Sequence, residues 1–339
     1  MSSLKTLLRL TRISETKFVS PAAAPPPGGS GVFGGTLVAQ SLWAAIQTSG
    51  QAFEPSSLHC YFIVRGDTSV RITYNVEVLR QGTNFVHRQV RAYQLDKLIF
   101  VASVLLHKTS AFEGPEDDRS RARDVRHVTK ADGLYPLEDT VPADDLFRSQ
   151  VLENIDRYSR LDRAWSDPQF THPFLERFTS GPVEYRFPRD VFNSGAYHEG
   201  PAEDHLDHLD YYQRVREPLE GSEAPEDSLS SSELSDPRFN YVAFAYLSDA
   251  YLLLMLPYFH QLPLYCSRFS VSLDHTIHFH QRPPVYDWMA LRVTNPRSRR
   301  GKHLVNGDYF NAASKSLIAS VRQEGLVVYD SPSGIRARF

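Results

Sequence analysis

The longest apolar run of the chain lies between Asn240 and His260, and Ala, Leu and aromatic residues fill it. No Gly interrupts this run and Pro257 comes only near its end, so the pattern predicts a helix. Apolar residues occupy every face of that helix, which indicates that other structure encloses it. A membrane span is the alternative for a run that approaches about 20 residues, but Ser248 and Asp249 at its centre argue against a span.

Asp249 requires an explanation of its own. An unpaired carboxylate inside a protein costs several kcal/mol even after relaxation. We therefore expect Asp249 to have a partner, a shifted pKa or a chemical function. A structural salt bridge or hydrogen bond explains the acid as well as catalysis does, when the residue is considered alone.

A second apolar helix is predicted over Val32–Gln47, opened by Gly34 and Gly35 after a Pro/Gly-rich loop. Four β-rich runs with short turns between them come after this helix, and four more come after the helix around Asp249. The first set is Ser57–Arg65, Val70–Arg80, Asn84–Tyr93 and Leu98–Lys108, and the second is Phe269–His280, Trp288–Thr294, His303–Phe310 and Leu317–Val328.

The two sets also match in local sequence. Three short segments of the first set occur again in the second. Ser57-Leu58 matches Ser272-Leu273 at an offset of 215 residues, Ala102-Ser103-Val104 matches Ala319-Ser320-Val321 at an offset of 217, and Gly82 matches Gly301 at an offset of 219. Offsets that drift so little indicate a duplicated module. We predict an α+β fold in which one long central helix, wrapped by a curved antiparallel sheet, occurs twice.

The segments between and after the two modules differ in composition. Charges of both signs crowd the segment after Ala111, and short helices are expected only around Leu146–Arg160. Pro182–Pro188 is predicted as a strand, and the acidic stretch Gly200–Asp236 as a solvated insertion with one strand-like island at Tyr211–Val215. The expected organisation is an N-terminal repeat over 1–112, a linker over 113–167, a C-terminal repeat over 168–330 with an insertion at about 200–237, and an exposed tail over 331–339.

Composition excludes several classes of function. The 339 residues carry 37 basic and 40 acidic side chains, a net charge of −3, without a long block of one sign. This balance offers no electrostatic footprint for nucleic acid or an anionic membrane. Cys60 and Cys266 match no metal spacing and suit a reducing compartment. The segment from Met1 to Lys17 lacks the apolar core of a signal peptide, although an amphipathic transit peptide is an alternative.

Several short motifs, taken together, resemble those of the acyl-CoA thioesterase II family. They are Phe33-Gly34-Gly35, Tyr61-Phe62, Arg65-Gly66-Asp67, Leu247-Ser248-Asp249, Leu273-Asp274-His275, Phe279-His280 and the run from Ala319 to Gly325. The resemblance implies a double hot-dog fold and hydrolysis of fatty acyl-CoA to free acid and CoA, with no metal and no cofactor. It also implies at least a dimer, that is, a homo-oligomer.

The same resemblance places a catalytic set on Asp249, Ser272 and Gln323, where Ser stands in the place of the more usual Thr. These three groups suit the hydrolysis of a thioester. The acid can accept a proton from water as general base, while a hydroxyl and an amide can orient that water. A covalent route through Ser272 would need an aligned base. His275 lies three residues further on, and residues three apart on a strand point to opposite faces, so we predict direct attack by water.

Substrate-binding candidates are less specific. Gly34 and Gly35 could supply backbone N–H groups to the thioester oxygen, because a helix N-terminus has free donors. The cluster Arg297, Arg299, Arg300 and Lys302 could bind CoA phosphates, or could simply be a solvated hairpin turn. His59 is interpreted as structural. His275, His278 and His280 invite a zinc hypothesis, but no third ligand has suitable spacing.

The C-terminal tripeptide Ala337-Arg338-Phe339 has the small–basic–bulky form of a peroxisomal address. It predicts a peroxisomal import receptor as partner and the peroxisomal matrix as location, with cytoplasm or mitochondrion as alternatives. Two other functions stay open: a hot-dog enoyl-CoA hydratase or dehydratase, which would need an Asp/His or Glu/His pair, and a non-catalytic acyl-CoA-binding module, which would lack the acid or the glutamine.

Overall fold

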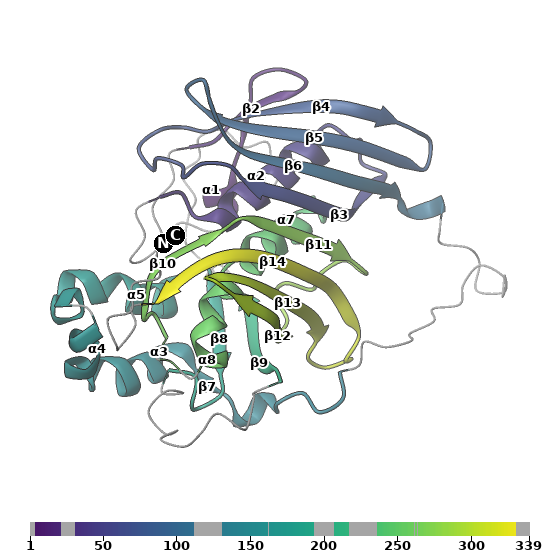
Figure 1. Ribbon diagram of the computed structural model, residues 1–339. Coiled ribbons are helices and arrows are strands. Elements are labelled where there is room, and N and C mark those ends of the chain that lie inside the picture. The colour runs from purple at the N-terminus through teal and green to yellow at the C-terminus, as the bar shows by residue number, and fades with distance from the viewer. Residues whose placement is uncertain are drawn as a thin grey trace, which may run out of the picture.

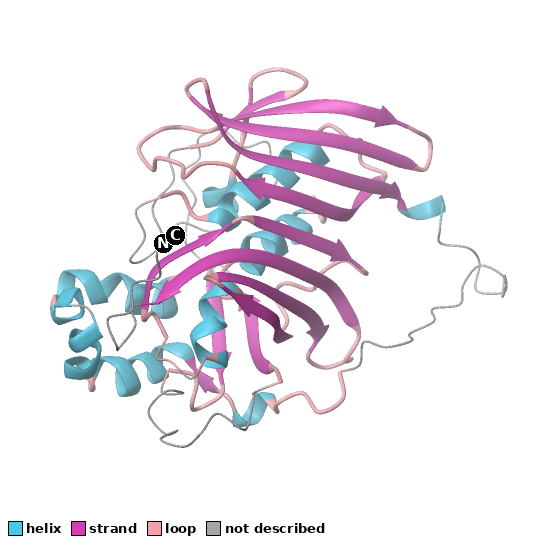
Figure 2. Cartoon of the chain, in the orientation of Figure 1, coloured by secondary structure: helices cyan, strands magenta, loops and turns pink. Residues whose placement is uncertain are grey.

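The computed structural model describes residues 4–21, 31–111, 131–161, 163–192, 207–216, 236–260, 262 and 264–329. In this part of the chain a single 14-stranded antiparallel sheet curves around two neighbouring helices (Figure 1). Figure 2 shows that the helices between residues 143 and 180 gather beside the C-terminal half of this sheet.

The elements of the N-terminal half are α1 (Leu4–Leu8), β1 (Thr11–Arg12), β2 (Lys17–Val19), α2 (Gly34–Gln47), β3 (Phe53–Phe62), β4 (Thr73–Gln81), β5 (Phe85–Gln94), β6 (Lys97–Lys108) and the 3-10 turn η1 (Thr109–Ala111). The connecting region holds η2 (Leu137–Asp139), β7 (Val141–Pro142), α3 (Ala143–Leu146), the π-helical turn η3 (Phe147–Leu152), α4 (Ile155–Leu161), η4 (Arg163–Ser166) and α5 (Pro168–Ser180). The C-terminal half has β8 (Val183–Phe187), β9 (Leu209–Val215), α7 (Phe239–Ser248), η5 (Leu253–Met255), α8 (Leu256–Phe259), β10 (Ser267–Ser272), β11 (Asp274–Phe279), β12 (Met289–Arg299), β13 (Lys302–Asn311) and β14 (Leu317–Tyr329).

Strand order repeats between the two halves. The N-terminal half runs β4-β5-β6-β3, and the C-terminal half runs β12-β13-β14 followed by β10 and β11, both of which pair with β14. Strands β3 and β11 pair antiparallel and join the halves into one sheet, with Ile277 opposite Leu58. The sheet order thus has the twofold repetition that the sequence offsets predict.

The two central helices pack against each other in opposite directions. Trp43, near the end of α2, makes an edge-to-face ring contact at 5.7 Å with Phe239 at the start of α7. At the other end, a Cβ on Gly35 would lie only 2.4 Å from the backbone oxygen of Tyr246. Every residue from Gly35 to Ile46 is buried, as an all-round apolar pattern predicts. The start of α2 therefore meets the end of α7.

The predicted long helix over Asn240–His260 is wrong in one respect, because α7 ends at Ser248 and Asp249 is its C-cap. The N–H of Ala250 turns back to the oxygen of Leu247 at 3.0 Å, and η5 and α8 continue the path. The stretch Phe239–Phe259 has the length and hydropathy of a membrane span, but 78% of its most apolar window is buried inside the protein. It is a core segment that breaks at the acid.

Part of the expected acidic insertion is also core structure. Strand β9 lies between β8 and β12, and Tyr211 and Gln213 on it are buried. Asp210 of the same strand pairs with Arg292 at 2.8 Å, which compensates its burial. The rest of that insertion, the start of the linker and the tail over 331–339 lie outside the described residues.

Candidate active site

Asp249 lies where the end of α7 meets the start of α2. Its backbone closes α7 as the C-cap, and its carboxylate accepts a hydrogen bond from the backbone N–H of Gly35. A Cβ on Gly34 would lie 2.5 Å from Oδ2 of Asp249, so only glycine permits this approach. Free N–H groups and the helix dipole at the start of α2 favour a negative charge here, whereas the end of α7 opposes one.

Gln323 and Ser272 complete the group from the sheet. The amide nitrogen Nε2 of Gln323 lies 2.6 Å from Oδ1 of Asp249 and 2.7 Å from Oγ of Ser272. Gln323 is fully buried on β14, and Ser272 ends β10 opposite Gly325. The structure thus brings the three sequence-predicted side chains together through one amide group, while their catalytic roles stay a prediction.

The electrostatic environment shifts the pKa of Asp249 into the neutral range. Burial raises this pKa from 3.8 to about 7, because a low-dielectric environment disfavours the charged form. Four groups limit the rise by favouring the carboxylate: the Gln323 amide, the Gly35 N–H, the Arg177 charge and the Ser272 hydroxyl. A carboxyl group with a pKa near 7 is suited to exchange protons at physiological pH.

Arg177 is a functional candidate that sequence reasoning missed. It lies on α5, a helix that the sequence pattern does not predict. Its guanidinium lies over the ring of Phe33 at 5.5 Å and over that of Tyr251 at 5.2 Å. The linker-like composition around it gives no signal, since only the fold brings α5 to the N-cap of α2. Cation–π contacts hold the positive charge beside the Asp249 site.

The prediction that Ser272 and His275 point to opposite faces of the strand is wrong. Ser272 pairs with Gly325, but Thr276 pairs with Arg322, so four steps on one strand oppose three on the other. This extra residue is a β-bulge, and it reverses the facing of the residues after it. His275 is therefore buried on the same side as Ser272, although a regular strand would place them on opposite faces.

Of the other sequence candidates, the basic cluster lies apart from Asp249. Arg297, Arg299, Arg300 and Lys302 are exposed at the hairpin between β12 and β13. Lys302 forms an ion pair at 3.0 Å with Glu324. Glu324 follows Gln323 on the same strand, so the side chain of Glu324 faces away from the site. Phosphate binding by this cluster stays a prediction.

The histidines on the outer face of the sheet do not approach Asp249 either. His59 on β3 is exposed and contacts the ring of His278 at 5.3 Å. In the described part of the chain no group of three His, Cys, Asp or Glu side chains has the arrangement of a metal site.

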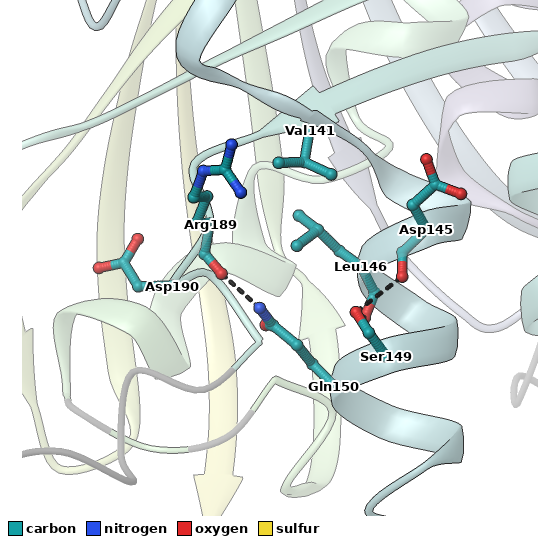
Figure 3. Close-up of a pocket in the computed structure, with 7 residues that line it drawn as sticks. All are labelled: Val141, Asp145, Leu146, Ser149, Gln150, Arg189 and Asp190. Carbon is teal, nitrogen blue, oxygen red and sulfur yellow. Dashed lines mark hydrogen bonds between the residues drawn. The ribbon is translucent and has the colours of Figure 1, made fainter.

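A separate surface cavity of about 440 Å³ lies between α3, η3 and the turn after β8 (Figure 3). In it the side-chain amide of Gln150 donates to the backbone oxygen of Arg189. The cavity shares no lining residue with the Asp249 group, so it is not part of this site.

The arrangement of the sheet around paired helices defines a double hot-dog protein, and comparison with known proteins narrows this class. A profile of acyl-CoA thioesterases matches residues 204–326, and one of the acyl-CoA thioesterase N-terminal domain matches residues 22–107. Peroxisomal acyl-coenzyme A thioester hydrolase 1 of Saccharomyces cerevisiae is 45% identical over 361 aligned positions, which cover 100% of this chain and 98% of that protein. The chain therefore belongs to the acyl-CoA thioesterase family.

Solved structures agree on the fold. An acyl-CoA thioesterase II from Mycobacterium marinum superposes with a TM-score of 0.63 at 22% identity, covering 98% of this chain and 100% of that one. A hot-dog protein of unknown function from Alicyclobacillus acidocaldarius gives a TM-score of 0.62 at 13% identity, covering 95% and 97%. These likenesses confirm the predicted fold class.

Proposed function

We propose that this acyl-CoA thioester hydrolase cleaves fatty acyl-CoA by direct attack of a water molecule that Asp249, Ser272 and Gln323 hold. One observation carries the proposal. The half-buried carboxyl group of Asp249, whose pKa is about 7, contacts the fully buried amide of Gln323, and this amide also contacts the hydroxyl of Ser272. Such a group offers a base and a hydroxyl to one water molecule, while the amide, whose nitrogen donates to both, fixes their positions.

The chemistry proceeds in one addition and one elimination. The water oxygen attacks the thioester carbonyl carbon while Asp249 accepts the water proton, which contributes roughly 10²–10⁴-fold to the rate. The C–S bond of the tetrahedral intermediate then breaks, and the proton returns from Asp249 to the departing CoA thiolate. The N–H of Gly35 donates to Asp249 and not to substrate as the sequence predicts, so the N–H of Gly34 and the dipole of α2 are proposed to favour the negative charge that develops on the carbonyl oxygen.

The partners of Ser272 argue against a serine–histidine pair as the source of an acyl-serine intermediate. The hydroxyl of Ser272 contacts the Gln323 amide and Asp249, whereas the nearby imidazole of His275 contacts Ser248 at 3.0 Å. Burial lowers the pKa of His275 to about 3, so this ring is a poor proton acceptor. A nucleophilic serine needs an aligned base, and here Asp249 is the group that contacts the hydroxyl, so a trap for an acyl-enzyme must separate attack by Ser272 from attack by water.

The site also argues against the two alternatives. A hydratase of this fold needs an acid and a histidine that both face substrate, but both ring nitrogens of His275 are buried against protein. A non-catalytic binding module has no need of a carboxylate whose burial raises its pKa to about 7. Hydrolysis accounts for both features.

We place the enzyme in the peroxisomal matrix. The relative from Saccharomyces cerevisiae, 45% identical, is named as peroxisomal, and this chain ends in Ala337-Arg338-Phe339, which an import receptor would read. The tail itself lies outside the described residues.

A thiol-release assay tests the proposal, with palmitoyl-CoA, a short-chain acyl-CoA and an enoyl-CoA as substrates. The expected result is release of CoA from saturated acyl-CoA without hydration of the enoyl-CoA. A single turnover quenched with hydroxylamine should yield no acyl hydroxamate from the protein fraction, because no acyl-enzyme forms. Hydration of enoyl-CoA, or an acyl group trapped on Ser272, would overturn this assignment.

A further inference from the structure

Two buried polar atoms beside the site have no close hydrogen-bond partner in the described part of the chain: Nδ1 of His275 and Oε1 of Gln323. Both side chains are fully buried. The two groups are neighbours, since Thr276 pairs with Arg322 and the antiparallel register therefore places His275 opposite Gln323; contact with Gln323 also raises the pKa of His275 against the lowering effect of burial. A buried polar atom left without a partner destabilises the folded protein, so the proximity of these two atoms favours a hydrogen bond between them.

The direction of each hydrogen bond is set by Asp249. With the carboxylate ionised, the amide nitrogen of Gln323 uses both of its protons, one toward Asp249 and one toward Ser272. Only the amide oxygen is left to face His275, and an oxygen requires a donor. In a neutral imidazole that donor must be Nδ1–H, which leaves Nε2 as an acceptor.

The other ring nitrogen satisfies this requirement. Nε2 of His275 lies 3.0 Å from the hydroxyl oxygen of Ser248, which also lies 3.0 Å from the backbone oxygen of Ala245. A hydroxyl has a single proton and can direct it to either acceptor. Donation to Nε2 fixes the tautomer in which Nδ1 carries the hydrogen.

We propose that His275 is a positioning residue whose Nδ1–H holds the amide oxygen of Gln323, so that the amide nitrogen faces Asp249 and Ser272. This inference rests on the proposed function and extends it to a side chain that does not touch substrate. Without the imidazole the amide can turn over, and its oxygen would then face the carboxylate and repel it. The water-holding geometry and the charge on Asp249 both depend on preventing this rotation.

A pH profile can report this role because the other groups around Asp249 keep their charge near neutral pH. Arg177 on α5 stays positive, and its pKa is raised. Burial raises the pKa values of Tyr246 on α7, Cys60 on β3 and Tyr309 on β13, so these groups stay neutral. The acid limb of the rate profile therefore reports the titration of Asp249.

The test compares the variants His275→Leu and His275→Asn with Gln323→Leu and the double variant His275→Leu/Gln323→Leu in palmitoyl-CoA hydrolysis. Asparagine keeps a side-chain N–H near the place of Nδ1, whereas leucine removes it. We expect His275→Leu to lose about 10- to 100-fold in kcat with KM little changed, and to move the acid limb to higher pH. His275→Asn should recover kcat and restore the limb toward that of the wild type.

The double variant separates positioning from a merely structural role. If His275 acts only through Gln323, the double variant should be no slower than Gln323→Leu alone. His87→Leu is the matched control, because His87 on β5 also has a buried Nδ1 without a close partner but lies outside the site. Its acid limb should not move.

Additive losses in the double variant, or a His275→Leu enzyme with the wild-type kcat and acid limb, would overturn the positioning role. If His275→Leu does not fold, Ser248→Ala gives the same readout. It removes the hydroxyl that contacts Nε2 of His275, so the imidazole is no longer held in the tautomer with a proton on Nδ1. The proposed function fails separately, namely if Asp249→Asn or Gln323→Leu hydrolyses palmitoyl-CoA at the wild-type rate.

Discussion

At the scale of single residues, the site depends on an Asp249 side chain whose surroundings both oppose and favour its negative charge. The residue caps α7 through its backbone, at the helix end that disfavours negative charge, and burial raises the pKa of its side chain to about 7. Hydrogen bonds from Gln323 and Gly35 and the charge of Arg177 offset only part of this cost. A proton acceptor of useful strength at neutral pH thus exists at the expense of stability.

This conflict predicts a pH-dependent gain in stability for Asp249→Asn. The folded-state pKa of about 7 exceeds the ordinary value of 3.8, so the wild-type protein loses stability as pH rises from about 4 to 7. Asparagine removes this loss, by up to about 4 kcal/mol above pH 7. Thermal melts should show a larger Tm advantage of the variant at pH 8 than at pH 5. An equal Tm difference at both values would contradict a raised pKa.

Ser272 should act through its hydroxyl and not through its size. Ser272→Ala removes the group that Nε2 of Gln323 contacts at 2.7 Å, and we expect kcat to fall about 100-fold. Ser272→Thr keeps the hydroxyl and adds a methyl group that restricts χ1, so its kcat should stay within about threefold of the wild type. Steady-state kinetics on palmitoyl-CoA would measure both, and a fully active alanine variant would exclude the hydroxyl from the mechanism.

The proximity of Asp249, Ser272 and Gln323 was the most predictable feature of the site, because the three residues stand in recognisable motifs, and their catalytic roles stay a prediction. The position of His275 was predicted wrongly, since a one-residue bulge between Ser272 and Thr276 has no clear sequence signal. Arg177 was missed because a charged residue in a linker-like segment is ordinarily solvated. Both errors concern which side chains the backbone brings together, which local patterns do not specify.

At the scale of elements, the decisive contact is the start of α2 against the end of α7. Gly34→Ala should disrupt it, because the new Cβ would lie 2.5 Å from Oδ2 of Asp249 and 2.9 Å from the ring of Phe62. We expect a loss of about 100-fold in kcat, since small displacements of reacting groups have effects of that size. The measurement is kcat for palmitoyl-CoA in a protein whose circular dichroism is unchanged.

Gly133→Ala serves as the control for backbone strain. Gly133 has a φ of 66° and open space around it, so alanine there should cost roughly 1 kcal/mol of stability and no activity. A Gly34→Ala enzyme as active as this control would show that the approach of α2 to Asp249 is unimportant.

Helix α5 contributes through the charge of Arg177, which lowers the pKa of Asp249. Arg177→Met should therefore raise this pKa and move the acid limb of kcat/KM to higher pH, while Arg177→Lys, which keeps the charge, should move it less. A pH–rate profile of the three proteins checks the order. If the acid limb lies at the same pH in all three proteins, the charge of Arg177 has no effect on the pKa of Asp249.

The element order itself was largely readable from the sequence, because the strands after each helix are bounded by clear turns. The exceptions have physical reasons. The apolar run Asn240–His260 gave no sign that α7 ends at Ser248, since Asp249 is compatible with a helix by propensity. Strand β9 agrees with the strand-like island predicted at Tyr211–Val215, but its burial in the core was not predicted, because its neighbours are acidic and its buried Asp210 is paired with Arg292.

At the scale of the whole molecule, duplication supplies a site that neither half has alone. The C-terminal half provides Asp249, Ser272 and Gln323, and the N-terminal half provides the N–H groups at the start of α2. The β3–β11 pairing fixes the two halves relative to each other. Repeat offsets in the sequence predicted the duplication but not the crossing of the helix ends that creates the site.

The proposed role of the C-terminal tripeptide concerns the location of the whole molecule. Removal of Arg338 and Phe339 should leave hydrolysis unchanged in vitro but should move a protein tagged at its N-terminus from peroxisomes to the cytosol. Fluorescence microscopy beside a peroxisomal marker checks this prediction. Continued peroxisomal location of the truncated protein would assign import to another signal.

The most direct test of the mechanism is the pH dependence of kcat/KM for palmitoyl-CoA hydrolysis by the wild type and Asp249→Asn. The wild-type value should fall below a pKa of about 7, the value that burial gives Asp249, because only the carboxylate accepts a proton. Asp249→Asn should lose at least about 100-fold and this acid limb with it. A wild-type profile that is flat from pH 5 to 8, or an Asp249→Asn enzyme that retains the wild-type rate, would contradict the account.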